Sequence, residues 1–328
     1  MLRRRLLMAS VGAALGCSPR LLAAEQRTTI RVSLSPLLTM SPFYTGFDEG
    51  LFRDAGLDLE LSRDLPGVQS IPLLAGGKLD VGFVPLSPGV ANAVLRGARL
   101  RIVAGREMAV TTCNGHRIYV KRSAYPNGIH DMRELRHKRI AISSATPMGL
   151  FCLDKLMEPV GMTRADIDIH AISSNDRLPA LLSGGVDAML AISTEPSMLL
   201  QSLNLVTGPG LADVLPNFQF SHIVFGSGLL ETDVRVGAKF LHAYFHGAHD
   251  FLAGRTPAFM DHFAAINNLD PALIRAACRD SFEHEGRLHF DDMKVYLDWM
   301  TKNGYLPTTM NPRDLVDTRF LEAEQRMS

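Results

Sequence analysis

The feature that most limits the fold of this chain is an internal duplication. Arg31-Val-Ser-Leu-Ser35 recurs as Arg139-Ile-Ala-Ile-Ser143, 108 positions later. A Leu-Leu-x-Gly-Gly run that leads to an aspartate occupies residues 73–80 and again residues 181–187. Such a period is too long for the small units of solenoid proteins. Each copy alternates strand-like and helix-like segments, so the duplication predicts two similar α/β lobes.

The two copies predict matching elements. In the first copy we expect strands at 28–34, 57–61, 80–84 and 101–104, helices at 41–55, 68–76 and 88–96, and an outgoing extended run at 116–121. In the second copy we expect strands at 139–143, 167–172, 188–192 and 203–206, helices at 147–160, 177–183 and 196–201, and a returning run at 220–225. The remainder is helical in pattern, at 234–253, 256–267, 271–279 and 290–303. We expect this part to cover the first lobe.

These elements predict an α/β fold of two lobes, each a mostly parallel sheet flanked by helices, with a ligand cleft between them. The expected first lobe comprises residues 25–114 and 226–328, and the second lobe comprises residues 115–225. The chain would cross between the lobes near 113–118 and near 221–226. A pair of crossings forms a hinge, because a few residues can absorb the closure of one lobe on the other.

The first 24 residues have the pattern of an export signal. Three arginines at 3–5 precede an apolar stretch, Leu6–Gly16, which is too short to span a bilayer. Leu22-Ala-Ala24 supplies small residues for cleavage, and the arginines also resemble the twin-arginine export pattern. Lipid attachment at Cys17 is an alternative, but Ala14 stands where leucine is usual. We therefore expect a periplasmic product, exported by the Sec or the twin-arginine route.

Charge and cysteine content argue against several classes of function. Lys+Arg and Asp+Glu are balanced at 34 each, which disfavours a nucleic-acid partner. Cys113, Cys152 and Cys278 have neither metal-site spacing nor a pattern that defines disulfides, and we interpret them as buried small side chains. The chain contains no P-loop, G-x-G-x-x-G or G-x-S-x-G motif. No cofactor is predicted.

Histidines offer a weak case for a metal. His242, His246 and His249 lie at helical spacing on one face, with Asp250 beside them, which could hold a metal ion. A solvated helix face explains the same spacing, and we favour that interpretation. His284-Glu285 followed by His289 does not match the H-E-x-x-H spacing of zinc proteases.

The candidate ligand site lies at four helix starts of one pattern: Ser41-Pro42, Ser87-Pro88, Thr146-Pro147 and Glu195-Pro196. Proline suits the first helical position, and ligands of open parallel sheets bind at the loops after the strands. Free N–H groups at helix starts favour anionic or acceptor-rich ligands. Alternatively, Ser41, Ser87 and Thr146 only cap their own helices.

Glu195 breaks this pattern, because glutamate is a poorer N-cap than serine or threonine. We hypothesise that its carboxylate accepts N–H donors from the ligand; the alternative is that it complements the helix terminus. Phe43 and Tyr44 could stack on a planar ligand or belong to the core. The full set of candidate ligand-binding residues is Ser35, Ser41, Phe43, Tyr44, Leu86, Ser87, Asn114, Ser144, Ala145, Thr146, Glu195 and His222.

Several of these segments resemble a known family. Residues 42–60, from Pro42-Phe-Tyr to Leu-Asp-Leu-Glu60, resemble the signature P-x-Y-x-A-x-x-x-G-x-F-x-x-x-G-L-x-V-x. That signature belongs to periplasmic substrate-binding proteins for nitrate, alkanesulfonates, taurine and thiamine-pyrimidine precursors. Residues 74–82 and the pair Glu195-Pro196 resemble two further motifs of that family. The resemblance, over about residues 28–310, implies a type II binding protein that serves the permease of an ABC importer.

Two departures bear on the ligand. Ser143-Ser-Ala-Thr-Pro-Met-Gly149 replaces the Gly-Ser-Thr run of the sulfonate and taurine members, which argues against a sulfonate. The chain also lacks the cysteine-rich motif of the family's fungal pyrimidine synthases. Glu195 as an acceptor requires an N–H donor on the ligand, and the helix starts favour acceptors, so together they favour a pyrimidine-like heterocycle.

Three functions follow as expectations. The first is capture of a small organic ligand by a monomeric, non-enzymatic binding protein. The second is an exported enzyme on the same fold that uses Glu195 with His222 or His116 as acid and base. The third is a ligand-sensing module for a membrane sensor.

Overall fold

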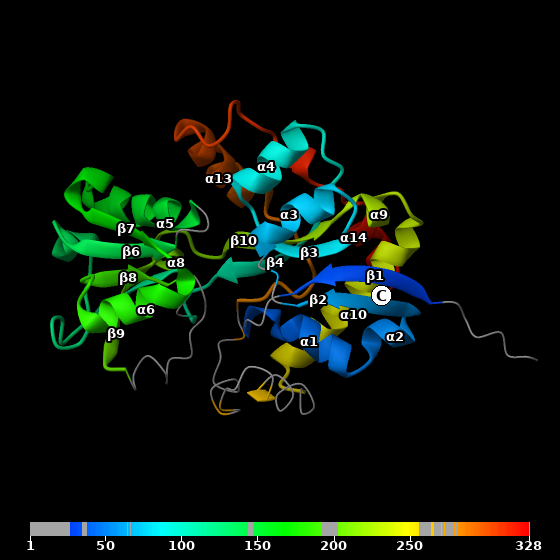
Figure 1. Ribbon diagram of the computed structural model, residues 1–328, viewed down its shortest axis with the longest axis horizontal. Helices are drawn as coiled ribbons and strands as arrows, with labels where there is room; N and C mark the ends of the chain where they lie inside the picture. The colour runs from blue at the N-terminus through cyan, green and yellow to red at the C-terminus, as the bar shows by residue number, and fades with distance from the viewer. Residues whose placement is uncertain are drawn as a thin grey trace, which may run out of the picture.

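The computed structural model contains two sheets joined by two chain crossings (Figure 1). It describes residues 27–34, 38–63, 65, 67–113, 115–143, 147–191, 203–255, 264, 265, 270, 272, 279 and 281–327. The first sheet has the order β2-β1-β3-β10-β4, and the second has the order β7-β6-β8-β5-β9. We call the parts built on these sheets lobe 1 and lobe 2. Within the described ranges, no helix is long and apolar enough to cross a membrane.

Lobe 1 is built from two separate stretches of the chain. Its strands are β1 (Thr28–Ser33), β2 (Leu57–Ser62), β3 (Val81–Pro85), β4 (Arg101–Ala109) and β10 (Phe218–Phe225). Its first helices are η1 (Leu38–Met40), α1 (Ser41–Asp48), α2 (Leu51–Asp54), α3 (Gly67–Ala75) and α4 (Pro88–Leu95). Those that follow β10 are α9 (Ser227–Leu230), α10 (Val234–Leu252), α13 (Phe290–Lys302), η5 (Pro312–Leu315) and α14 (Arg319–Glu324).

Lobe 2 is continuous in sequence. Its strands are β5 (Arg117–Lys121), β6 (Arg139–Ser143), β7 (Asp168–Ile172), β8 (Ala188–Leu190) and β9 (Leu205–Gly210). Its helices are η2 (Met132–Leu135), α5 (Met148–Met157), η3 (Glu158–Val160), η4 (Arg164–Asp166), α6 (Ser174–Ser183) and α8 (Leu211–Val214). The two-lobed α/β fold predicted from the sequence is confirmed, with sheets that are mixed rather than mostly parallel.

The duplication is visible in the pairing of the strands. β1 pairs in parallel with β2 and β3, and β6 pairs in parallel with β7 and β8. In each sheet one strand, β10 or β5, runs antiparallel to both of its neighbours. That strand comes from the part of the chain next to a crossing, so each lobe completes its sheet at the junction.

An ion pair is duplicated with the sheets. Arg31 donates from Nε and Nη2 to Asp80 at 2.8 and 2.7 Å, and Arg139 donates from the same atoms to Asp187 at 3.1 and 2.9 Å. In both lobes the arginine's backbone N–H also donates to that carboxylate, at 2.9 Å. The repeated Arg and Asp positions of the sequence are thus equivalent positions in space.

The helices after β10 serve both lobes. α10 packs on α1 and α14, on the side of the lobe 1 sheet where Val32, Phe225 and Phe240 are buried. α13 instead lies between β10 and α5 of lobe 2 (Figure 1). The expected cover on lobe 1 is therefore present in α10 and α14, but α13 also joins the lobes. The expected helices at 256–267 and 271–279 fall outside the described residues.

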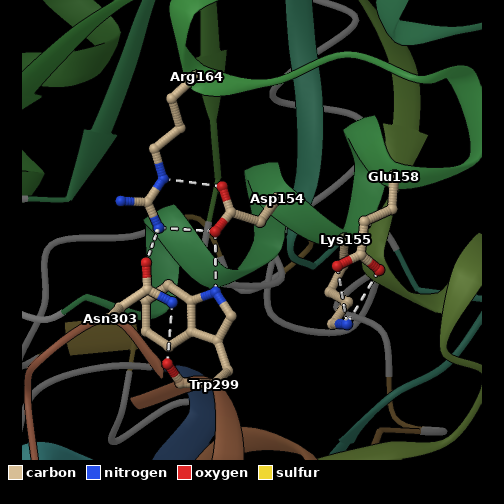
Figure 2. A network of polar contacts seen from close by, with 6 residues as sticks. All are labelled: Asp154, Lys155, Glu158, Arg164, Trp299 and Asn303. Carbon is tan, nitrogen blue, oxygen red and sulfur yellow. Dashed lines mark hydrogen bonds and ion pairs between the residues drawn. The ribbon is translucent and has the colours of Figure 1, made fainter. Parts of the chain in front are cut away.

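A polar network holds α13 against lobe 2. Asp154 on α5 accepts two bonds from Arg164, at 2.8 and 2.6 Å, and one from the indole N–H of Trp299 at 2.8 Å (Figure 2). Arg164 also donates to Asn303 at 3.0 Å. Phe151 lies 5.6 Å from Trp299, ring centre to ring centre. We refer to these residues as the α5–α13 junction.

Three details differ from the expectations. Gly50 has φ +80°, a left-handed conformation that ends α1 and separates it from α2, so the expected helix 41–55 is two helices. β10 belongs to the sheet of lobe 1, because it pairs with β3 and β4, which places the return crossing before Phe218 rather than near 221–226. The interpretation of Cys113 as a simple buried thiol was wrong, because Cys113 is disulfide-bonded. Cys152 is a free, buried thiol, and Cys278 lies outside the described residues.

The outer edge of β4 is covered by a late segment of the chain. Met108 N–H donates to Ser281 at 2.8 Å, and Glu283 N–H donates to Arg106 at 2.7 Å. Gly105 N–H donates to Gly286 at 2.9 Å. This pairing protects the sheet edge and fixes Ser281 next to the start of the first crossing.

Candidate functional site

A small hollow lies where the chain leaves lobe 1 for lobe 2. It measures about 10 Å³, about the room that one water molecule needs. It is lined by residues from η1, from the end of β4 and the crossing after it, from β10 and from the segment that covers β4: Thr39, Glu107, Met108, Ala109, Val110, Cys113, Gly115, His116, Phe220 and Ser281. The hollow therefore lies beside the first crossing between the lobes, and not at the helix starts of the predicted site.

A buried ion pair forms one wall. Glu107 and Arg106 are 5% and 3% exposed, and Arg106 Nη1 donates to Glu107 Oε2 at 2.7 Å. The guanidinium also donates to Ser221 Oγ at 2.8 Å and to the carbonyl of Thr39. Burial raises the pKa of Glu107, while Arg106 acts in the opposite direction. The pair thus places a carboxylate at the hollow, next to a counter-ion that does not line it.

His116 also lines the hollow. It is a buried residue with φ +53°, and its ring centre lies 4.1 Å from that of Phe220. Burial and then the nearby charge of Arg177 on α6 lower the pKa of His116 to about 4. The imidazole is therefore neutral near pH 7 and presents one donor and one acceptor.

His222 is buried in the middle of β10. It pairs with Val84 of β3 and Gly105 of β4, and its side chain is completely buried. Neither ring nitrogen has a hydrogen-bond partner among the described residues. Burial, followed by the charges of His289 and Arg106, lowers the pKa of His222 to about 3. His222 does not line the hollow.

The predicted residues of the first helix lie in the core of lobe 1. Phe43 is fully buried, with Phe52 at 5.2 Å and Phe83 at 5.5 Å between ring centres. Tyr44 is 5% exposed and contacts the edge of Phe43. Ser41 is buried as the first residue of α1, whose N-cap is Met40, so Ser41 is not the predicted cap. Neither ring lines the hollow.

The loop after β3 is closer to the predicted arrangement. Ser87 is the N-cap of α4, as expected, and is 3% exposed. Its hydroxyl has no hydrogen-bond partner within the described part of the chain. Leu86 is buried, and its N–H donates to the carbonyl of Phe220 at 3.0 Å. This loop therefore lies beside a residue of the hollow.

The other predicted site residues, Ser35, Asn114, Ser144, Ala145, Thr146 and Glu195, lie outside the described residues. The structure brings Leu86 and His116 together around Phe220. None of the candidate ligand-binding residues that the structure describes lines the hollow, and of its lining residues only His116 was a functional candidate, as an acid or base. Sequence reasoning missed the others, among them Glu107, Phe220 and Ser281. Glu107 had a signal, because Arg106-Glu107 interrupts the apolar strand with two adjacent opposite charges. Ser281 had none, since only the fold brings it beside β4.

The histidine face of α10 borders a second, open hollow of about 660 Å³, lined also by His284, Glu285 and Glu324. His242 Nδ1 lies 3.1 Å from Glu324, and His249 Nδ1 lies 3.0 Å from Arg255. Within the ranges that the structure describes, no three of these side chains are arranged to hold a metal ion.

Comparison with protein families gives one match of more than half the chain. The model of the family described as NMT1/THI5 like matches residues 38–254. No curated protein matches in a sequence search.

Solved structures match over nearly the whole fold. The alkanesulfonate-binding protein SsuA from Xanthomonas axonopodis pv. citri, bound to MOPS, has TM-score 0.70 and 16% identity, and the match covers 89% of this chain and 99% of that one. The periplasmic nitrate-binding protein NrtA from Synechocystis PCC 6803 has TM-score 0.69 and 11% identity, with 92% and 90% covered. A mutant of the desulfurization enzyme DszB, in complex with biphenyl-2-sulfinic acid, has TM-score 0.69 and 17% identity, with 92% and 100% covered. At these identities the likeness establishes a common fold.

Proposed function

Because the chain belongs to the NMT1/THI5-like family, we propose that it is the solute-binding component of an ABC importer and captures a small organic ligand between its two lobes. The observation that carries this proposal is the hollow at the junction, where the crossing, β10 and the end of β4 meet. The fold is shared with SsuA and NrtA, which are binding proteins for alkanesulfonate and nitrate.

The proposed ligand carries acceptors on one edge and an N–H donor on another, as a pyrimidine-like heterocycle does. Glu107 offers an acceptor on the lobe 1 side, and Arg177 places a buried positive charge near His116 on the lobe 2 side. These opposite charges suit a zwitterionic or dipolar molecule better than a simple anion. Glu195 remains the second proposed acceptor, and Ser87 lies at a helix start next to Leu86, which contacts Phe220 of the hollow.

Closure of the lobes is the proposed mechanism. Contacts of one ligand with both lobes favour the closed state, and only such differential affinity shifts the population. In the periplasm, where the leader would direct the monomeric protein, the closed form would dock on the membrane permease. A smaller radius of gyration with saturating ligand in X-ray scattering is the expected result, and equal radii would contradict closure.

An enzyme is the second candidate, because DszB shows that this fold also carries catalysis. His116 and His222 are poor general bases for such catalysis. With pKa values of about 4 and 3, His116 and His222 have little tendency to accept a proton at pH 7. A ligand-sensing module for a membrane sensor would use the same cleft. The membrane protein that binds the closed form, a permease or a sensor, distinguishes transport from sensing.

Binding and catalysis are separated by one experiment. The purified protein is incubated with heterocycles, carboxylates and sulfonates, while its melting temperature and the products are followed. A binding protein gains about 2.7 kcal/mol of stability at a ligand concentration about 100 times its Kd, without turnover. Product formed in excess over the protein would overturn the binding function, and stabilisation by simple anions alone would overturn the heterocycle.

A further inference from the structure

We propose that Glu107 selects the ligand of this cleft by accepting a hydrogen bond from an amino or ammonium group of the ligand, with Ser281 as the second contact. This rests on the proposed function, since it assigns the chemistry of the same cleft. It adds Glu107 and Ser281, which were not among the candidate ligand-binding residues, to the proposed site.

The direction of the buried ion pair is the first argument. Glu107 lines the hollow, whereas Arg106 does not and is fixed by Ser221 and by the Thr39 carbonyl. The carboxylate is therefore the member of the pair that adjoins the ligand space. A carboxylate has about four acceptor sites, so Glu107 can accept a further bond while it keeps those from Arg106 and Ser221.

The unpartnered hydroxyl of Ser281 is the second argument. Ser281 is 4% exposed, and its Oγ has no hydrogen-bond partner among the described residues. Its position is set by the backbone, because its carbonyl accepts from Met108 and Phe282 pairs with Glu107. A buried hydroxyl without a partner is unfavourable, so this one is suited to a polar group that enters the hollow.

Size and walls restrict that group. The hollow holds about one water molecule, so an amino group fits and a sulfonate or a ring does not. The neutral His116 and Phe220 also line it. An anionic oxygen in this space would face a buried carboxylate, which is repulsive. The remainder of the ligand then extends from the hollow into the cleft.

Two pairs of probes test this, each differing in one amino group: 4-aminopyrimidine against 4-methylpyrimidine, and taurine against ethanesulfonate. Calorimetry measures Kd for the wild type, Glu107→Gln, Ser281→Ala and the control Glu283→Gln. Glu283 is 6% exposed in the segment beside β4 but does not line the hollow. We expect the wild type to bind the amino member of at least one pair about 10-fold or more tightly than its partner.

Glu107→Gln should reduce that preference at least about 10-fold and Ser281→Ala at least about 3-fold, while Glu283→Gln retains it. If Glu107→Gln loses equal affinity for both members of a pair, or keeps the preference for the amino member, Glu107 only supports Arg106. The proposed binding function would stand in either case. A wild type that binds none of the four probes, or only ethanesulfonate, also overturns the assignment. Turnover of a probe would instead overturn the proposed function. If Glu107→Gln does not fold, Ser281→Ala decides alone.

Discussion

At the scale of single residues, two buried histidines are neutral near pH 7. His116 and His222 are buried, with pKa values lowered to about 4 and about 3. The unfolded chain binds a proton at each near about pH 6.5, whereas the folded protein does not. Their contribution to stability is therefore complete above about pH 6.5 and is lost as the pH falls toward the folded pKa values.

The replacement His222→Asn should reveal this dependence. In the wild type, each of the two histidines should lower the free energy of unfolding by about 1.4 kcal/mol per pH unit below about pH 6.5. Between about pH 6.5 and 5, the free energy of unfolding of the variant should fall less steeply with pH, by the contribution of one histidine. Urea denaturation at several pH values measures this slope. The exposed His130→Asn serves as the control and should keep the slope. Equal slopes in wild type and His222→Asn would contradict the assignment.

How far the sequence predicts the site also depends on individual residues. The sequence repeat contains an arginine and an aspartate in each copy. The structure shows that they form equivalent ion pairs, Arg31 with Asp80 and Arg139 with Asp187. Ser87 was predicted at a helix start by its proline neighbour and is the N-cap residue of α4, although its hydroxyl makes no capping hydrogen bond. Phe43 could not be assigned, because an aromatic residue in a first helical turn suits a core and a cleft equally. Ser281 reaches the hollow only through pairing with β4, which no local pattern encodes.

At the scale of elements, the described strands and helices follow most of the predicted spans, because apolar periodicity and Pro or Gly punctuation are local signals. The expected helix at 196–201 lies outside the described residues. The pairing partners are not local. Residues 218–225 read as a strand, but only the fold shows that β10 enters the sheet of lobe 1 between β3 and β4. The predicted strand at 101–104 is shorter than β4, because the charged residues Arg106 and Glu107 interrupt the apolar run from which a strand is predicted.

The contact between α1 and α10 depends on glycine. A Cβ at Gly247 would lie 2.6 Å from the backbone N and 2.7 Å from the Cα of Gly46. Gly247→Ala should therefore destabilise the protein by about 1–3 kcal/mol, although alanine favours a helix by about 1 kcal/mol. The exposed neighbour His246→Ala gains the propensity without the clash. Urea denaturation of both variants measures the difference, and a Gly247→Ala protein as stable as wild type would show that the helices can move apart.

At the scale of the whole molecule, the described part of the chain joins the lobes through two chain crossings and through the α5–α13 junction. The junction is half-buried, with Asp154 at 21% and Arg164 at 35% exposure of their side chains. On the same helix, Lys155 pairs with the 60% exposed Glu158 (Figure 2). The two pairs therefore form a matched comparison of a joining contact with a surface one.

Asp154→Asn should cost about 1–3 kcal/mol of stability, because Arg164 and Trp299 lose a charged acceptor. Glu158→Gln should cost at most about 0.5 kcal/mol. Trp299 is the chain's single tryptophan, so its fluorescence reports on the junction directly. In Asp154→Asn we expect the fluorescence transition in urea to precede the circular dichroism transition. Coincident transitions at the wild-type midpoint would mean that α13 holds the lobes by apolar packing alone.

The position of β10 determines the order in which the protein can be completed. β4 is separated from β3 in the sheet of lobe 1 until residues 218–225 insert between them. The strands of lobe 2 all lie between residues 117 and 210. A chain that emerges with its N-terminus first, from a ribosome or through a translocation channel, can therefore finish its second lobe while the first is still incomplete. The lobe that begins the sequence is therefore the last to be completed.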